Sequence, residues 1–207
     1  MSYAAGSTAE AHSLAISAHL TLCPSCRCKA GRAEAIGGAF LDDLEGTALK
    51  PAALQSLLAQ LDEVEAGAPT VFDGPYSANL PRRLPSALAD YTARALTRSN
   101  WRFVAPGIKQ LMLDTKSSPR ARLLKLKPGT VLPEHSHRGT ELTLLLAGSY
   151  QDELGRFVRG DFAELDEGVT HKPMVDEGEE CIALIVTERP LKFNGLMARL
   201  AQPLIGI

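Results

Sequence analysis

The stretch from Gly129 to Gly148, GTVLPEHSHRGTELTLLLAG, constrains the fold of this chain more than any other. Its two histidines, His135 and His137, are two residues apart, and Glu141 follows four residues later. Residues two apart on a β-strand point to the same face, and Glu141 has the same parity, so the three side chains can converge. We expect the same strand to continue through the apolar residues 142–146 into a core.

Imidazole nitrogen and carboxylate oxygen suit a divalent metal ion, and three ligands from one segment leave a site that another segment completes. The segment GDFAELDEGVTH, residues 160–171, supplies the candidate, His171, after two glycines that allow tight turns. In the alternative interpretation, His135 and His137 are solvated turn residues. The agreement of three separate spacings favours the metal site over that alternative.

Both segments resemble the motifs of the cupin family. The first cupin motif, G-x5-H-x-H-x3-E-x6-G, is matched at every defined position, by Gly129, His135, His137, Glu141 and Gly148. The second motif, G-x5-P-x-G-x2-H-x3-N, is matched at its glycines and its histidine, whereas Asp166 replaces the proline and Val175 the asparagine. The resemblance implies a small all-β barrel, a double-stranded β-helix or jelly roll. It also implies that zinc or another divalent metal ion is bound by His135, His137, Glu141 and His171.

The rest of the chain shows two kinds of sequence pattern, one helical and one typical of β-strands. Residues 7–65 carry apolar residues at helical spacing, as in AEAHSLAISAHLTL and KPAALQSLLAQLDEVEAG. Residues 66–85 contain four prolines and predict a linker. From Trp101 onward, short apolar or alternating runs separated by turn residues predict β-strands, after one short helix in LPSALADYTARAL. We therefore expect an α + β protein of two domains, a helical domain over 1–65 and an all-β domain over 86–207.

The last predicted helix of the N-terminal domain has an apolar stripe, formed by Leu54, Leu57, Leu58 and Leu61. Such a stripe is either the core of the domain or a surface for a partner. Small helical domains have little else to bury, so we favour the core.

A second group of metal-binding side chains lies near the N-terminus, where His19, Cys23 and Cys26 have the spacing H-x3-C-x2-C. Residues four apart are neighbours on a helix, so His19 can face Cys23 at the helix end, and Cys26 can return from the next turn. Thiolates with imidazole are typical ligands of structural zinc. A chance cysteine pair or a redox dithiol is the alternative, but the helical context differs from the βαβ setting of a thioredoxin motif. Cys28 and His12 are the local candidates for a fourth ligand.

A helical domain with this zinc motif, followed by a cupin domain, resembles the ChrR-type anti-sigma factors. Stretches such as HLTLCPSCRCKAGRAEAIGG, HRGTELTLLLAGSYQDE and LKFNGLMARLAQPLIGI carry the resemblance over nearly the whole chain. It implies that the helical domain binds an extracytoplasmic-function sigma factor and blocks its access to RNA polymerase. It also implies that the cupin domain senses an oxidant, singlet oxygen or an organic hydroperoxide, and triggers release.

The family's pattern has a further helix and a further zinc-ligand histidine upstream of the segment that begins at Tyr3. We therefore expect one of two states for the site at His19, Cys23 and Cys26. Either it is empty or partly occupied, or a second copy of the chain, in a homodimer, covers the exposed apolar faces and adds a ligand.

Composition limits the other partners. With 22 Lys and Arg against 24 Asp and Glu among 207 residues, the net charge of −2 gives no basic footprint for nucleic acid or an anionic membrane. No apolar run is long enough to span a bilayer and the first residues lack a secretory signal, so we expect a cytoplasmic protein.

The rival interpretation is an enzyme, a cupin dioxygenase or isomerase with a helical appendage. Four protein ligands and no evident general base argue against hydrolysis, while oxygen chemistry at the metal stays compatible.

Overall fold

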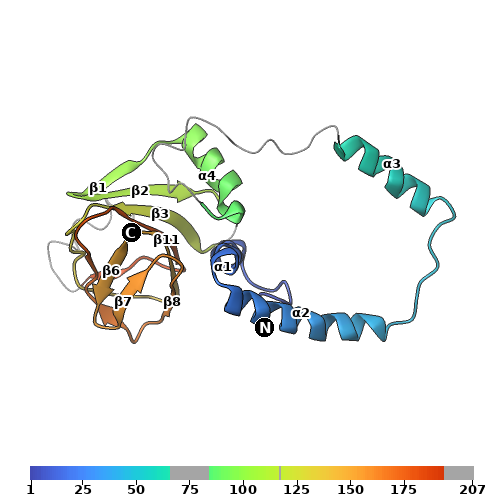
Figure 1. The fold of residues 1–207 in the computed structure, drawn as a ribbon, viewed down its shortest axis with the longest axis horizontal. Coiled ribbons are helices and arrows are strands. Elements are labelled where there is room, and N and C mark those ends of the chain that lie inside the picture. Colours follow the sequence, from blue (N-terminus) through green and yellow to red (C-terminus); the bar gives the residue numbers. More distant parts are fainter. Residues whose placement is uncertain (66–83, 117, 194–207) are drawn as a thin grey trace.

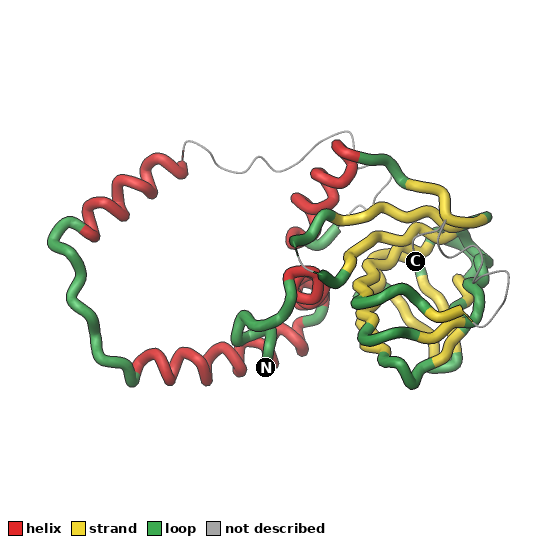
Figure 2. Tube along the Cα trace, turned by 180° about the vertical axis from the view of Figure 1, so that it is seen from behind, coloured by secondary structure: helices red, strands yellow, loops and turns green. Residues whose placement is uncertain are grey.

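The computed structural model describes residues 1–65, 84–116 and 118–193. Four helices precede a β-barrel in these residues: α1 (Glu10–Leu22), α2 (Pro24–Asp42), α3 (Ala53–Glu65) and α4 (Ser86–Arg98). Figures 1 and 2 show α1 and α4 lying against one side of the barrel, whereas α2 and α3 extend away from it. None of the described helices combines the length and the apolar character that a bilayer span requires. Most of the predicted linker, residues 66–83, lies outside the described residues.

The barrel is built from antiparallel strands in three sheets. In chain order the strands are β1 (Arg102–Ala105), β2 (Ile108–Leu113), β3 (Arg120–Leu126), β4 (His135–Ser136), β5 (Glu141–Ala147), β6 (Ser149–Asp152), β7 (Gly155–Val158), β8 (Phe162–Leu165), β9 (Thr170–His171), β10 (Met174–Val175), β11 (Cys181–Thr187) and β12 (Lys192–Phe193). The largest sheet has the order β1-β2-β3-β11-β5-β8, and the two smaller ones are β10-β6-β7 and β12-β4-β9. The predicted fold class, helices followed by an all-β cupin barrel, is therefore confirmed.

The strand β5 separates two hydrophobic clusters because its successive side chains point to opposite faces of the sheet. Leu142, Leu144 and Leu146 belong to the cluster on the outer face, and Leu145 belongs to the cluster inside the barrel. The strand ends at Gly148, whose φ of 68° is left-handed. A Cβ there would lie 2.6 Å from the carbonyl oxygen of Glu180, so the close passage of two backbones requires glycine.

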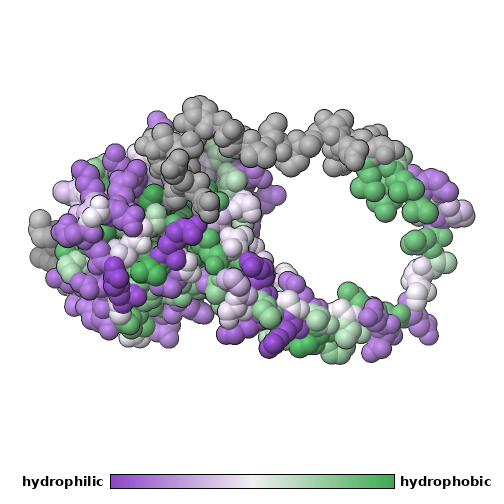
Figure 3. All heavy atoms as spheres, in the orientation of Figure 1, coloured by the Kyte–Doolittle hydropathy of each residue, from purple (hydrophilic) through white to green (hydrophobic). Residues whose placement is uncertain are grey.

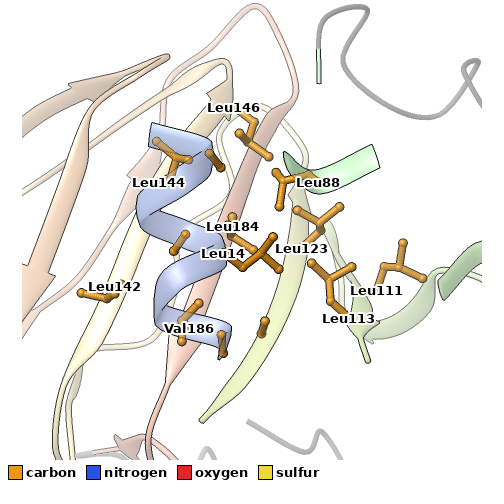
Figure 4. Close-up of a cluster of buried hydrophobic side chains, with 14 of the residues drawn as sticks. Leu14, Leu88, Leu111, Leu113, Leu123, Leu142, Leu144, Leu146, Leu184 and Val186 are labelled. Carbon is orange, nitrogen blue, oxygen red and sulfur yellow. The ribbon is translucent and has the colours of Figure 1, made fainter. Parts of the chain in front are cut away.

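The outer face of the six-stranded sheet is covered by α1 and α4. Figure 4 shows α1 lying over Leu142, Leu144 and Leu184. The side chains that α1 buries here are mostly small, namely Ala11, Leu14, Ala15 and Ala18. Three alanines let the helix axis approach the sheet closely, and burial of each leucine contributes about 1.5–3 kcal/mol.

The position of α1 differs from the sequence-based expectation, which placed it in a helical domain of residues 1–65. The apolar residues at helical spacing were predicted, but they pack on the barrel and on α4. A helical period shows which face is buried, and it carries no information about what covers that face. The boundaries of the two domains stay a prediction.

The expectation that the apolar stripe of α3 forms a core is wrong for this structure. Leu54 is 62% exposed and Leu58 is 50% exposed, and Leu57 and Leu61 lie between these values. Apolar residues of α2 are exposed as well, including Phe40 and Leu41. Figure 3 shows apolar surface on both helices. Among the described residues, these side chains of α2 and α3 stay at least half exposed.

Candidate metal centres

Four residues that the sequence singled out meet inside the barrel: His135, His137, Glu141 and His171. All four are buried. β4 pairs with β9 so that His135 lies directly opposite His171, which brings the second predicted segment to the first. The ring nitrogens of the three histidines offer ligand atoms within 4.8 Å of one another.

The predicted continuous strand from His135 to Leu146 is wrong. β4 ends at Ser136, a turn follows, and β5 begins at Glu141 in a different sheet. Gly139 makes this turn possible with a φ of 88°, a region that other residues rarely adopt. The convergence of the three ligands therefore comes from a change of sheet and not from the parity of one strand.

Hydrogen bonds fix the orientation of two of the imidazoles. His135 donates from Nδ1 to the carbonyl oxygen of Pro133 at 2.8 Å, and His171 donates from Nδ1 to Oδ2 of Asp152 at 2.8 Å. A neutral imidazole that donates from Nδ1 keeps a lone pair on Nε2. The two Nε2 atoms nevertheless lie only 3.1 Å apart.

Two lone pairs at this distance repel each other, and a cation between or beside them would relieve the repulsion. A proton is one candidate, but burial lowers the pKa of His135 and so disfavours an imidazolium at that residue. A metal ion is the other candidate. Two nitrogens bound at 2.0–2.1 Å lie about 2.8–3.4 Å apart in octahedral or tetrahedral geometry, which matches the observed spacing. The donor set therefore fits a divalent metal ion.

His137 and Glu141 complete the group. Neither ring nitrogen of His137 has a hydrogen-bond partner of good geometry in the described part of the chain, although Nδ1 lies 3.5 Å from Oε2 of Glu141. Thr143 donates to Oε1 of Glu141 at 3.0 Å. Burial raises the pKa of Glu141, but His137, His135 and the hydroxyl of Thr143 lower it more, so the net shift is downward. The ionised carboxylate of Glu141 and the imidazole of His137 are both available to a cation.

A small cavity of about 60 Å³ adjoins these residues inside the barrel. Besides the metal-ligand candidates, Arg122 and Thr187 line it, and the rest of its walls are mainly apolar and include Tyr150 and Cys181. Burial raises the pKa of the Cys181 thiol to about 12, so this cysteine is not a reactive thiolate at neutral pH. The volume exceeds that needed for one water molecule but accommodates only a molecule of a few heavy atoms.

Sequence reasoning missed Asp152, the carboxylate that orients His171. Its side chain is fully buried at the end of β6. It stands outside both cupin motifs, and only the fold brings it to His171, 19 residues later in the chain. The run SYQDE could have indicated this residue, because an acidic side chain directly follows a predicted strand that contains a tyrosine. Such a run is also typical of an exposed turn.

The second group, at His19, Cys23 and Cys26, is organised by the break between α1 and α2. Pro24 begins α2 and holds the preceding Cys23 in an extended conformation, with φ −114° and ψ 101°. His19 in the last turn of α1 and Cys26 in the first turn of α2 then face Cys23, and the three ligand atoms lie within 4.8 Å of one another.

The environment of Cys23 suits a thiolate. The backbone amide of Cys26 donates to Cys23, and this contact, followed by that of the Cys26 thiol, lowers the pKa of Cys23. Cys23 also precedes the first turn of α2, where the helix dipole favours a negative charge. Two sulfurs and an imidazole form a donor set that fits zinc.

Neither candidate for a fourth ligand joins this group. Cys28 is exposed and lies two residues after Cys26, which turns it by about 200° around the helix axis. His12 lies seven residues before His19, about 10 Å away along α1. The described residues therefore bring together three ligands and leave the fourth position open.

Comparisons with known proteins point to one family. A family described as the ChrR cupin-like domain matches residues 91–191. The anti-sigma-E factor ChrR of Cereibacter sphaeroides is 40% identical to the chain over 206 residues, which cover 99% of this chain and 93% of that protein. The crystal structure of Rhodobacter sphaeroides SigE in complex with the anti-sigma ChrR is similar with a TM-score of 0.71 and 38% identity, covering 90% of this chain and 93% of that one.

Proposed function

Because the chain belongs to the ChrR family of anti-sigma factors, we propose that it binds and inhibits a sigma factor of the extracytoplasmic-function class. One structural observation carries the proposal, the exposed apolar stripe of α3 at Leu54, Leu57, Leu58 and Leu61. Monomeric proteins rarely leave contiguous apolar surface of this kind uncovered. An amphipathic helix that presents leucines at positions i, i+3, i+4 and i+7 is suited to a hydrophobic groove on another protein.

The exposed residues of α2 extend the proposed surface. Ile36, Phe40 and Leu41 add an aromatic and two aliphatic side chains, the residue types that form the buried centres of protein interfaces. Each large side chain that a partner buries contributes about 1.5–3 kcal/mol before the costs of association. A second copy of this chain is the other candidate for the surface.

The barrel is the proposed sensor. We propose that it binds zinc or another divalent ion through His135, His137, Glu141 and His171, and that an oxidant, singlet oxygen or an organic hydroperoxide, acts there to trigger release of the sigma factor. Support comes from the three imidazoles, whose ring nitrogens offer ligand atoms within 4.8 Å of one another, and from the adjoining cavity. Since the matched relative is an anti-sigma factor, a cupin dioxygenase or isomerase is not favoured.

At the N-terminal site we propose zinc bound by His19, Cys23 and Cys26. A metal there joins the end of α1 to the start of α2, and its binding free energy would stabilise the angle between these helices. The chain's own contribution is the extended Cys23 before Pro24, which holds one thiol between the two helices.

The sigma-binding proposal is tested by coexpressing the chain with an extracytoplasmic-function sigma factor. The double variant Leu57→Asp/Leu58→Asp places two charges on the apolar stripe, and we expect it to lower the affinity by on the order of 100-fold. Ser56→Asp, on the exposed opposite side of α3, is the matched control and should keep the wild-type affinity.

The readouts are copurification, titration calorimetry and inhibition of transcription by the sigma factor. Equal affinities of wild type and the double variant would contradict the assignment of this surface. Sedimentation of the chain alone distinguishes the other occupant: a dimer that the double variant dissociates would show that a second copy covers the stripe.

A further inference from the structure

The metal-ligand candidate His19 touches the barrel directly. Its Nδ1 lies 3.0 Å from the carbonyl oxygen of Gly160, a residue 141 positions later in the chain. Its ring lies against the ring of Phe162, with 5.0 Å between the ring centroids. Gly160 lies in the turn between β7 and β8, and Phe162 begins β8. One imidazole therefore faces two cysteines of the N-terminal segment and the barrel at the same time.

The contact with Gly160 determines the tautomer of His19. A carbonyl oxygen only accepts hydrogen bonds, so Nδ1 carries the proton and Nε2 keeps the lone pair. Nε2 is then the ring nitrogen available to a metal ion shared with Cys23 and Cys26. Metal-binding histidines usually donate their other N–H to a carbonyl or a carboxylate, which fixes the ring and raises its basicity. The barrel supplies that acceptor here.

The contact between His19 and Gly160 is part of a larger interface between α1 and the barrel. Leu22, the last residue of α1, lies over the same turn, because a Cβ built at Gly160 would be 3.8 Å from the Cβ of Leu22. Further along α1, Leu14 and its neighbouring alanines are buried on the outer face of the sheet. The metal-binding end and the apolar face of α1 therefore dock on the barrel together.

We propose that the β7–β8 turn of the barrel forms the outer coordination sphere of the N-terminal metal site, so that metal binding and the docking of α1 on the barrel stabilise each other. The carbonyl of Gly160 and the ring of Phe162 act as positioning groups for His19. Linkage requires the effect to be reciprocal: docking tightens metal binding by the same factor by which the metal tightens docking. The inference rests on the proposed metal site at His19, Cys23 and Cys26, and it is independent of sigma-factor binding.

Cobalt(II) titration of the full chain tests this coupling. Thiolate-to-cobalt charge-transfer absorption reports binding at Cys23 and Cys26, whereas the barrel group of three histidines and Glu141 contains no thiolate. The variant Phe162→Ala removes the ring that holds His19 and leaves all three proposed ligands in place. We expect it to weaken cobalt binding at this site by about 10-fold, the lower end of the effect of losing an outer-sphere partner.

Two further variants separate positioning from general damage to the barrel. Phe157→Ala removes another half-buried phenylalanine, one that stacks on Tyr150 inside the barrel, and it should change the affinity less than about twofold. Phe162→Tyr restores the ring and should restore the affinity. Hydrogen exchange supplies the reciprocal readout: cobalt should slow exchange of the α1 amides in the wild type more than in Phe162→Ala.

The outcomes distinguish this inference from the metal-site proposal on which it rests. If the wild type shows no charge-transfer band, both the site and the coupling are refuted. If the band appears with equal affinities in the wild type and Phe162→Ala, the site stands and the coupling is refuted. Equal losses in Phe162→Ala and Phe157→Ala would also overturn the coupling, since they would reflect loosening of the barrel alone.

Discussion

Replacing Asp152 by asparagine changes one atom group next to the proposed barrel metal site. The Asp152 carboxylate is fully buried and accepts a hydrogen bond at 2.8 Å from Nδ1 of His171, which is itself only 3% exposed. Asparagine has nearly the same shape, so Asp152→Asn replaces a charged acceptor with a neutral one. His171 keeps its place in β9, while the basicity of its Nε2 falls.

The expected magnitude follows from the change in this hydrogen bond. A bond to a charged acceptor contributes about 1.5–3 kcal/mol, compared with about 0.5–1.5 kcal/mol for a neutral one. The difference of about 1–1.5 kcal/mol corresponds to about a 10-fold loss of metal affinity. This value lies at the lower end of the range for substitutions of outer-sphere partners.

The assay is competition for zinc with a chromophoric chelator, in a Cys23→Ser/Cys26→Ser background so that only the barrel site is measured. Asp176→Asn is the matched control, because Asp176 accepts from Ser149 and Arg156 on the same barrel and contacts none of the metal-ligand candidates. We expect the control to bind zinc like its parent. An unchanged affinity in Asp152→Asn, or an equal loss in Asp176→Asn, would refute the role given to Asp152.

Three further predictions concern the docking of α1 and the core beneath it. The hydrogen bond from Tyr91, and then the backbone amide of Lys116, lower the pKa of Glu10 on α1. Its carboxylate therefore stabilises the docked helix above the ordinary pKa of about 4.3 and loses this effect as the pH falls through the lower folded-state value. Denaturant midpoints should fall below about pH 4 in the wild type and less in Glu10→Gln. Leu144→Ala should lower the free energy of unfolding by about 2–5 kcal/mol, measured by urea denaturation, because Leu144 is fully buried under α1. A fragment of residues 86–207, the proposed barrel domain, should fold cooperatively but be about 4–5 kcal/mol less stable for want of Leu14 and three alanines; an insoluble fragment would contradict the proposed boundary.

The barrel cluster was predictable because its spacings are local. His135, His137 and Glu141 lie within seven residues of one another, and one further motif located His171. The prediction was wrong about the backbone between them, where a turn with a glycine of positive φ leads the chain from one sheet into another. One continuous strand, as predicted, and two strands in different sheets, as observed, both bring these three side chains together.

The contacts that the sequence did not predict share a different property: they join distant parts of the chain. Gly160 meets His19 across 141 residues, and Asp152 meets His171 across 19. No short motif records such pairs. The stripe of α3 was misjudged for a related reason, since a pattern of leucines shows only that a face avoids water and does not show whether the cover is this chain or another protein.

Side chains of β5 alternate between the cavity and the face under α1, so the number of residues in this strand is constrained. Odd-numbered residues such as Glu141 and Thr143 line the cavity, while even-numbered residues such as Leu142 and Leu144 lie under α1. Deleting or inserting one residue in the strand would exchange the two faces downstream, placing leucines at the polar site and polar groups under the helix. The strand β5 therefore tolerates substitutions on one face at a time, whereas a change of its length by one residue would disturb both faces.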